Sequence, residues 1–387
     1  MERDELSAWL RLHLTPGVGN ASALKLLAAF GLPTQIFEQA ELALSQVVSA
    51  SQAAALRNTP PDWSTLLDTT WNWLAAQPDQ HRVLTLGDPA YPQSLLQLED
   101  PPLLLYAMGD PQVWEDNTLA NGVRYSLAIV GSRNPTPQGL GNARSFAKAL
   151  AQGGLTIISG MAMGVDGAAH EGALEGAPAG QLATVAVVGT GLDRVYPKEH
   201  RDLAHRIAQR GLLLSEYPLG TPPTPANFPR RNRILAGLSF GTLVVEAALK
   251  SGSLITARLA LEQGKDVFAI PGSIHATQAR GCHALIKQGA KLVESAQDVL
   301  EELAWPQAVL YAIDSGADCA SGTGENASFA TETPLLQALG FEPTGLDALQ
   351  ARTGMDTPTL QGQLMQLELD GVVLRLPGGL FQRVAQA

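Results

Sequence analysis

This sequence of 387 residues is poor in cysteine and has no long hydrophobic run. Its two cysteines, Cys282 and Cys319, stand in unrelated contexts, so neither a disulfide framework nor a thiolate metal site is indicated. No apolar run approaches the roughly 20 residues of a membrane-spanning helix, and the N-terminal Met-Glu-Arg-Asp-Glu is acidic where a signal peptide would be basic. We therefore expect a cytoplasmic protein that does not enter a membrane.

An excess of basic residues is also missing overall, but the charge is unevenly distributed. The net charge of −11 comes from the flanks: residues 1–125 hold 6 basic against 14 acidic residues, and residues 303–387 hold 3 against 9. Residues 126–302 hold 17 basic against 14 acidic residues. A mildly basic centre between acidic flanks favours a polyanion site in the central domain, although an ordinary solvated surface gives a similar count.

The length predicts two or three domains. Residues 1–80 show helical apolar patterns. Residues 81–305 are expected to form an extended Rossmann-like domain, in which a proline-rich, extended bridge around Asp88-Pro and Asp100-Pro-Pro precedes alternating strands and helices from Ser126. Residues 306–332 form a linker of small residues. Residues 333–387 have the order helix, helix, helix, hairpin, which is typical of a winged helix. The third of these helices has no Lys or Arg, so a role in protein contacts or structure is favoured over entry into a DNA groove.

One turn near the N-terminus, Thr15-Pro-Gly-Val-Gly19, resembles a helix-hairpin-helix turn, in which backbone N–H groups receive a phosphate. The alternative is a tight turn followed by Asn20 or Ser22 as the cap of a packing helix. The acidity of the surrounding segment favours this structural interpretation.

The central segment indicates an α/β fold. Each short apolar run is followed by a helix, which is typical of a doubly wound, Rossmann-like parallel sheet covered on both faces. Such a sheet binds ligands at the carboxyl ends of its strands. The expected strands are residues 127–130, 156–159, 184–188, 212–216, 242–245, 267–270 and 291–293.

The loops after three of these strands carry Gly, Ser and cationic residues at helix starts, where open N–H groups and the helix dipole face an anion. A further segment, residues 221–233, places three arginines beside Phe228 on a proline-stiffened loop. The ring either stacks on unpaired bases or plugs its own loop, and the arginines bind phosphates or pair with carboxylates. The candidate DNA- and phosphate-binding residues are Gly131, Ser132, Arg133, Ser159, Gly160, Gly164, Phe228, Arg230, Arg231, Arg233, Lys250, Ser251, Gly252, Ser253 and Thr256.

Catalytic and cofactor patterns are incomplete. Residues 189–194 begin like a dinucleotide fingerprint but carry Arg194 at the third glycine position, and no P-loop occurs. The histidines lack metal-ligand spacing, so no metal or other cofactor is expected. We expect His170 on a helix surface and a structural role for Asp166.

Through the central segment, motifs follow one another in the order of the DprA/Smf family, the DNA-processing proteins of bacterial natural transformation. The chain resembles this family at Gly131-Ser-Arg133, Ser159-Gly-Met-Ala-Met-Gly-Val-Asp166, Phe228-Pro-Arg-Arg-Asn-Arg233 and Lys250-Ser-Gly-Ser-Leu-Ile-Thr256. One departure is His283, where the family pattern has an asparagine.

The resemblance implies a non-enzymatic protein that binds and protects single-stranded DNA, forms a homodimer through its Rossmann-like domain, and loads the recombinase RecA onto the strand. It places Arg133, Phe228, Arg230, Arg231 and Arg233 in the DNA pocket. It also implies a SAM-like helical domain at the N-terminus and a winged-helix domain at the C-terminus.

An enzyme is the alternative. Residues 241–246 resemble the Rossmann-like, lysine-decarboxylase-like nucleotide phosphoribohydrolases. Their Pro-Gly-Gly lead-in is missing, because Leu238-Ser-Phe stands before Gly241. Glu246 would then be an unpartnered acid and not half of a catalytic pair.

Overall fold

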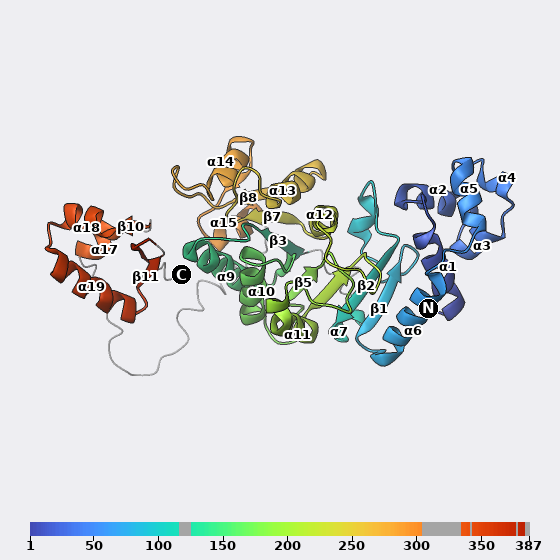
Figure 1. Ribbon diagram of the computed structural model, residues 1–387, viewed down its shortest axis with the longest axis horizontal. Coiled ribbons are helices and arrows are strands. Elements are labelled where there is room, and N and C mark those ends of the chain that lie inside the picture. The colour runs from blue at the N-terminus through green and yellow to red at the C-terminus, as the bar shows by residue number, and fades with distance from the viewer. Residues whose placement is uncertain (116–124, 304–333, 341–342, 377, 384–387) are drawn as a thin grey trace.

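The computed structural model describes residues 1–115, 125–303, 334–340, 343–376 and 378–383, so the predicted linker lies outside the described residues. Its centre is a nine-stranded sheet with the order β1-β2-β6-β5-β4-β3-β7-β8-β9 (Figure 1). The neighbours from β6 to β9 in this order pair in parallel, which confirms the expected Rossmann-like sheet. The strands are β1 (His81–Thr85), β2 (Leu104–Gly109), β3 (Ser126–Val130), β4 (Thr156–Ser159), β5 (Thr184–Val187), β6 (Leu212–Ser215), β7 (Gly241–Val244), β8 (Asp266–Ala269) and β9 (Lys291–Leu292).

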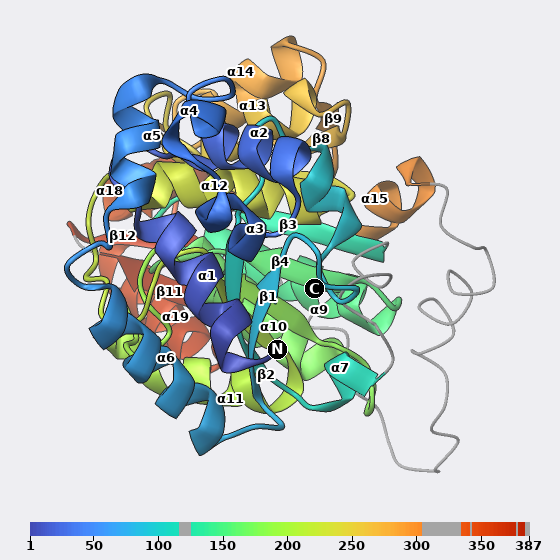
Figure 2. The same cartoon turned by 90° about the vertical axis from the view of Figure 1, so that its right-hand side faces the viewer.

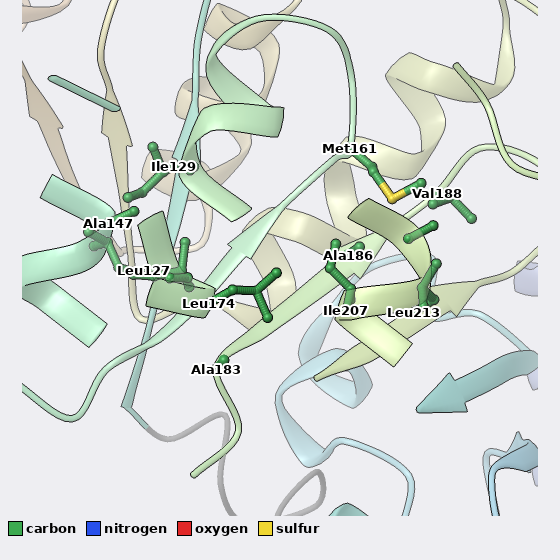
Figure 3. Close-up of a cluster of buried hydrophobic side chains, with 14 of the residues drawn as sticks. Leu127, Ile129, Ala147, Met161, Leu174, Ala183, Ala186, Val188, Ile207 and Leu213 are labelled. Atoms are coloured by element: carbon green, nitrogen blue, oxygen red, sulfur yellow. The ribbon is translucent and has the colours of Figure 1, made fainter. Parts of the chain in front are cut away.

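Helices cover both faces of the sheet because its strands are apolar on both sides. Leu127 and Ile129 of β3 point into one core, shown in Figure 3, and Val130 points into the other. Complete burial of such a side chain is worth about 1.5–3 kcal/mol. The first core is closed by α9 (Pro137–Gln152), α10 (Val165–Gly176), α11 (Arg201–Arg210) and α15 (Ala296–Glu302), and the second by α12 (Asn227–Leu238), α13 (Ser253–Glu262) and α14 (Arg280–Lys287).

Two antiparallel strands extend the sheet where the sequence predicted only an extended proline-rich bridge. β1 pairs with β2, and β2 pairs with β6. Helices α1 (Arg3–Leu14) and α6 (Trp63–Ala76) pack against these strands, since Trp9 shares a buried cluster with Val83 and Tyr106. Figure 2 shows these N-terminal helices on the side of the molecule that faces the viewer.

The remaining N-terminal helices have a small core of their own, built around buried residues such as Leu26 and Leu56. Gly17 has a φ of +78°, which favours glycine in this turn, and the next helix begins directly after Gly19. No side chain caps that helix, so the expected cap at Asn20 or Ser22 is wrong. Instead, the side-chain amide of Gln52 donates hydrogen bonds to Ser22 Oγ at 3.0 Å and to Gly17 O at 2.7 Å, and so links the helix start to the turn. The helices are α2 (Asn20–Phe30), α3 (Pro33–Glu38), α4 (Glu41–Leu44) and α5 (Ala50–Arg57).

The C-terminal elements confirm the predicted winged-helix plan. Strand β12 lies between β10 and β11 in a three-stranded antiparallel sheet, and the three helices close a separate core. The elements are α17 (Pro334–Leu339), β10 (Thr344–Gly345), α18 (Leu346–Thr353), α19 (Thr357–Leu369), β11 (Val373–Leu376) and β12 (Leu380–Arg383). Among the helices of the described residues, none is both long and apolar enough to cross a membrane.

Candidate nucleic-acid interface

The carboxyl ends of β3 and β7 lie side by side where the strand order reverses. From β3 the chain adds β4, β5 and β6 on one side, and it then returns to β7 on the other side of β3. Doubly wound sheets bind ligands at this position. A cleft of about 620 Å³ opens there, and ten of the fifteen predicted residues line it: Gly131, Ser132, Arg133, Phe228, Arg231, Lys250, Ser251, Gly252, Ser253 and Thr256.

The loop after β3 presents an exposed arginine to the cleft. A Cβ at Gly131 would stand 2.7 Å from a methyl group of Val165, so glycine is required where this loop crosses the start of α10. Ser132 Oγ accepts a hydrogen bond from the Asn134 backbone at 3.1 Å, which fixes the turn. Arg133 is exposed, and its guanidinium carbon lies 5.3 Å from the centre of the Phe228 ring. The loop therefore places a cation beside an aromatic face.

The loop after β4 does not provide the open helix start that the sequence predicted. Val165 N donates to Ser132 O at 3.1 Å, and Gly167 N donates to Ala162 O at 3.2 Å, so two of the first three amides of α10 are occupied. Ser159 is buried and donates to Ile129 O at 2.7 Å. Gly164, with a φ of +83°, allows this close crossing of chains and does not line the cleft. The expected anion site at this helix start is thus wrong.

Phe228 and its arginines lie on a helix and not on a loop, which corrects a second prediction. They occupy the first two turns of α12. A helix directs neighbouring side chains to different faces, so Arg231 points into the cleft. Arg233 forms ion pairs with Glu216 and, at 3.5 Å, with Asp100. Neither Arg233 nor the exposed Arg230 lines the cleft.

Arg231 is buried at the floor of the cleft beside the carboxylate of Asp166. The two side chains are only 3% and 7% exposed. Burial lowers the pKa of Arg231 to about 10, which leaves it protonated at neutral pH. Burial raises the pKa of Asp166, and the attraction of Arg231 opposes this shift. Asp166 accepts a hydrogen bond from Ala162 N at 3.3 Å, so the expected structural role of Asp166 agrees with its contacts.

The loop after β7 supplies hydroxyl groups and a second exposed cation. Ser251 Oγ and Ser253 Oγ lie 2.7 Å apart at the start of α13, and Lys250 is exposed beside them. The hydroxyl of Thr256 and Nε of Arg231 are both buried without a hydrogen-bond partner, and both residues line the cleft. A buried polar atom without a hydrogen-bond partner costs free energy. A ligand that formed hydrogen bonds with the Thr256 hydroxyl and with Arg231 Nε would remove this cost and bind more tightly.

Sequence reasoning missed one aromatic residue of the site. The ring centre of Tyr196 lies 5.6 Å from that of Phe228, and Tyr196 is exposed on the same wall. These residues are 32 positions apart and come together because Asn227, at the start of α12, donates to Gly189 O at 3.0 Å. The only sequence signal for it was its aromatic character, two residues after the glycine-containing stretch 189–194.

One further expectation is wrong. His170 is fully buried and not on a helix surface, with Nδ1 2.7 Å from Thr184 Oγ1. The Glu246 carboxylate accepts hydrogen bonds from Thr136 N at 2.9 Å and from Thr136 Oγ1 at 2.6 Å, and these contacts do not make it half of a catalytic pair. This carboxylate lines a separate hollow and not the main cleft. Within the described ranges, no group of three or more His, Cys, Asp or Glu side chains is placed to hold a metal ion.

The model of the family described as "DNA recombination-mediator protein A" matches residues 82–304, which is more than half of the chain. The chain belongs to this family. A second model, the DprA winged helix domain, matches residues 323–379. The chain is therefore a DprA-type protein in both its central and its C-terminal parts.

Individual relatives agree with this assignment. Protein Smf of Escherichia coli (strain K12) is 40% identical over 315 residues, which covers 81% of this chain and 80% of the relative. Protein Smf of Synechocystis sp. is 34% identical and covers 99% of this chain and 100% of the relative. An X-ray structure of DNA processing protein A from Streptococcus pneumoniae has a TM-score of 0.63 and 36% identity, covering 78% of this chain and 98% of that one. A structure of DNA processing protein A from Helicobacter pylori, which concerns the single-stranded DNA binding mode of that protein, has a TM-score of 0.50 and 32% identity, covering 58% of this chain and 97% of that one.

Proposed function

We propose that this chain binds single-stranded DNA in the cleft at the carboxyl ends of β3 and β7. The observation that carries the proposal is the guanidinium of Arg133 beside the ring of Phe228, in a cleft that also holds Arg231 and Lys250. Cations bind the phosphates of a strand, and an aromatic face stacks on its bases for about 1–3 kcal/mol each. Duplex DNA hides its base faces, so this combination favours an unpaired strand.

Arg133 and Lys250 are the exposed cations of the cleft and would make the first phosphate contacts. Arg231 lies deeper and has a buried Nε without a partner, and Thr256 has a hydroxyl in the same condition. A phosphate oxygen that reached them would satisfy both groups. Asp166 partly offsets the positive charge of the floor, so affinity in this proposal comes mainly from Arg133, Lys250 and stacking on Phe228.

We propose that the site is not catalytic. Two carboxylates that follow β4 and β7 in the chain carry structural hydrogen bonds, Asp166 with Ala162 and Glu246 with Thr136. Glu246, the acid that a phosphoribohydrolase would use, lines a separate hollow and not the main cleft. Incubation of the pure protein with nucleoside monophosphates tests this point, because release of free base would overturn it.

The resemblance extends the proposal to partners. We propose that the chain dimerises through its Rossmann-like domain, protects the bound strand and loads RecA onto it. The winged-helix domain has no Lys or Arg on α19, which supports a protein contact there. The rate of RecA assembly on a strand, with and without this protein, measures loading. Sedimentation of the free protein measures dimerisation.

We also propose the division of the chain into a SAM-like helical domain at residues 1–80, a DNA-binding domain at residues 81–305 and a winged-helix domain at residues 333–387. Separate cores in the N-terminal helices and in the C-terminal elements support this division. At the first boundary, α1 and α6 of the helical domain pack on β1 and β2 of the DNA-binding domain, so the two domains share one hydrophobic core there.

The direct test is a salt titration of binding to single-stranded and duplex oligonucleotides of equal length, without nucleotide or metal. We expect the single strand to bind more tightly at every salt concentration, with a log–log slope of about −0.7 for each phosphate contact. Equal binding of the two forms would contradict the role of Phe228. The absence of any salt dependence would contradict the role of the cations.

A further inference from the structure

A second, smaller hollow lies directly behind the wall that carries Phe228. It has a volume of about 60 Å³ and shares four residues with the main cleft: Arg133, Ala162, Tyr196 and Phe228. The rest of its lining comes from the loops after β4 and β5 and from Pro197. The two hollows therefore form one track along the carboxyl ends of β7, β3, β4 and β5, divided by an aromatic wall.

Two large apolar side chains are exposed at the smaller hollow. Tyr196 is 44% exposed and Met163 is 45% exposed, and both line it. Nearly half of the surface of each residue is therefore open to a ligand. An aromatic ring and a flexible thioether beside a cationic cleft are side chains on which a planar base can lie.

The floor of the hollow is backbone, because two glycines stand there. A Cβ at Gly189 would lie 3.2 Å from the Phe228 ring, and a Cβ at Gly160 would overlap the guanidinium of Arg231. Arg133 is the one charged residue in the lining. A neutral floor with a single cation at its border suits a base, whereas a phosphate would need more cations than this hollow provides.

We propose that Tyr196 and Met163 form a second base-binding subsite, which takes the nucleobase next along the strand from the base on Phe228. This inference rests on the proposed binding of single-stranded DNA. Arg133 borders both hollows, so it would contact the phosphate that links the two nucleotides. The hollow is shallow and presents no acidic or amide side chain, so the subsite accepts any base by stacking.

The test compares an ordinary single strand with an abasic strand of the same length and charge. Tyr196→Ala is expected to weaken binding of the ordinary strand about 5-fold or more and to leave binding of the abasic strand within about 2-fold. Tyr196→Phe keeps the ring and is expected to bind like the unaltered protein. Arg133→Ala is the matched control, because loss of a phosphate contact weakens binding of both strands.

Tyr196→Leu separates stacking from general apolar contact and from folding. Leucine keeps apolar area at this exposed position, so a stable Tyr196→Leu protein that also loses about 5-fold on the ordinary strand supports stacking. Equal effects of Tyr196→Ala on ordinary and abasic strands would overturn the subsite. If Tyr196→Ala changes the sedimentation coefficient of the protein but leaves DNA binding unchanged, the subsite is also overturned. Tyr196 and Met163 would then be assigned to a contact with a second copy of the chain.

Failure of the subsite and failure of the proposed function give different results. If the unaltered protein binds ordinary strands, and if Tyr196→Ala and Tyr196→Leu bind them as tightly as the unaltered protein does, only the subsite is wrong. If the unaltered protein binds neither strand, the proposed function itself is wrong and the subsite falls with it.

Discussion

The guanidinium carbon of Arg133 lies 5.3 Å from the centre of the Phe228 ring, although the two residues are 95 positions apart in the sequence. Arg133 follows β3, and Phe228 is the second residue of α12, which packs on the second face of the sheet. A cation–π contact of this kind is worth about 0.5–1 kcal/mol at an exposed site. Each residue therefore helps to position the other, and a bound strand would meet both groups at once.

Arg133→Ala is expected to weaken binding of single strands and to flatten its dependence on salt. Removal of one phosphate contact reduces the log–log slope by about 0.7. Binding isotherms at several NaCl concentrations measure both quantities. An unchanged slope together with unchanged affinity would place Arg133 outside the DNA site.

Arg230→Ala is the matched control for Arg133→Ala. Arg230 is also an exposed arginine, but it does not line the cleft. We expect its removal to change affinity by less than about 2-fold and to leave the salt slope nearly unaltered, because the charge lies on another face of α12. If Arg230→Ala weakens binding as much as Arg133→Ala does, the strand follows a different path over α12.

Asp166→Ala is expected to destabilise the protein. The substitution removes the carboxylate whose attraction favours the charged form of the buried Arg231, and it leaves Ala162 N without its acceptor, so we expect a loss of about 1–3 kcal/mol. Urea unfolding of the full chain measures the loss. The double variant Asp166→Ala with Arg231→Met is expected to recover part of it, since neither buried charge remains. A neutral effect of Asp166→Ala would show that Arg231 does not depend on this carboxylate.

His170 is expected to make the protein acid-labile. The Thr184 hydroxyl donates to Ile157 O at 2.6 Å, so its oxygen accepts from Nδ1–H of a neutral His170. Burial lowers the pKa of His170 from 6.5 to about 3. The unfolded chain therefore binds one more proton than the folded chain between these pH values, and stability falls as the pH drops below about 6.5.

The expected slope from this single group approaches about 1.4 kcal/mol per pH unit in the middle of that window, between about pH 4 and pH 5.5. Denaturant unfolding between pH 4 and pH 7 measures it. His170→Gln is expected to flatten the slope by about one proton, whereas His205→Gln, at an exposed position, leaves it as it was. Equal slopes in all three proteins would contradict the burial of a neutral His170.

The parallel sheet was predictable because continuous apolar runs such as those around Ile129 and Ile157 have few other uses. The start of α12 was not, because Pro229 suggested a loop. A proline in the first turn of a helix loses no hydrogen bond, and the helix accordingly begins at Asn227. The strands β1 and β2 were missed because prolines surround them and because they are buried at nearly every position, so no alternation of polar and apolar residues marks them as strands.

The residue types of the site were predictable, but their directions were not. Three arginines close together in sequence suggested one cationic cluster, whereas the helix sends Arg231 into the cleft and Arg233 toward Glu216. Similarly, glycines that suggested open helix starts allow close crossings of chains instead, as Gly164 does over Ser132. The directions of these side chains and the crossings of these chains depend on tertiary packing, which cannot be deduced from the spacing of residues in the sequence.

Removal of residues 333–387 is expected to leave the affinity for single-stranded DNA within about 2-fold. Among the described residues of the winged-helix domain, none lines the main cleft, and α19 brings no cation to a phosphate. One described hydrogen bond joins the two parts, from Gln382 Nε2 to Gln138 Oε1 at 3.2 Å, and it lies at the start of α9, away from Arg133 and Phe228. Isotherms of the full and shortened chains on the same oligonucleotide measure the effect, with thermal unfolding of the central domain as the control for folding. A collapse of binding in a shortened chain that still unfolds at the same temperature would mean that the acidic winged helix takes part in DNA binding.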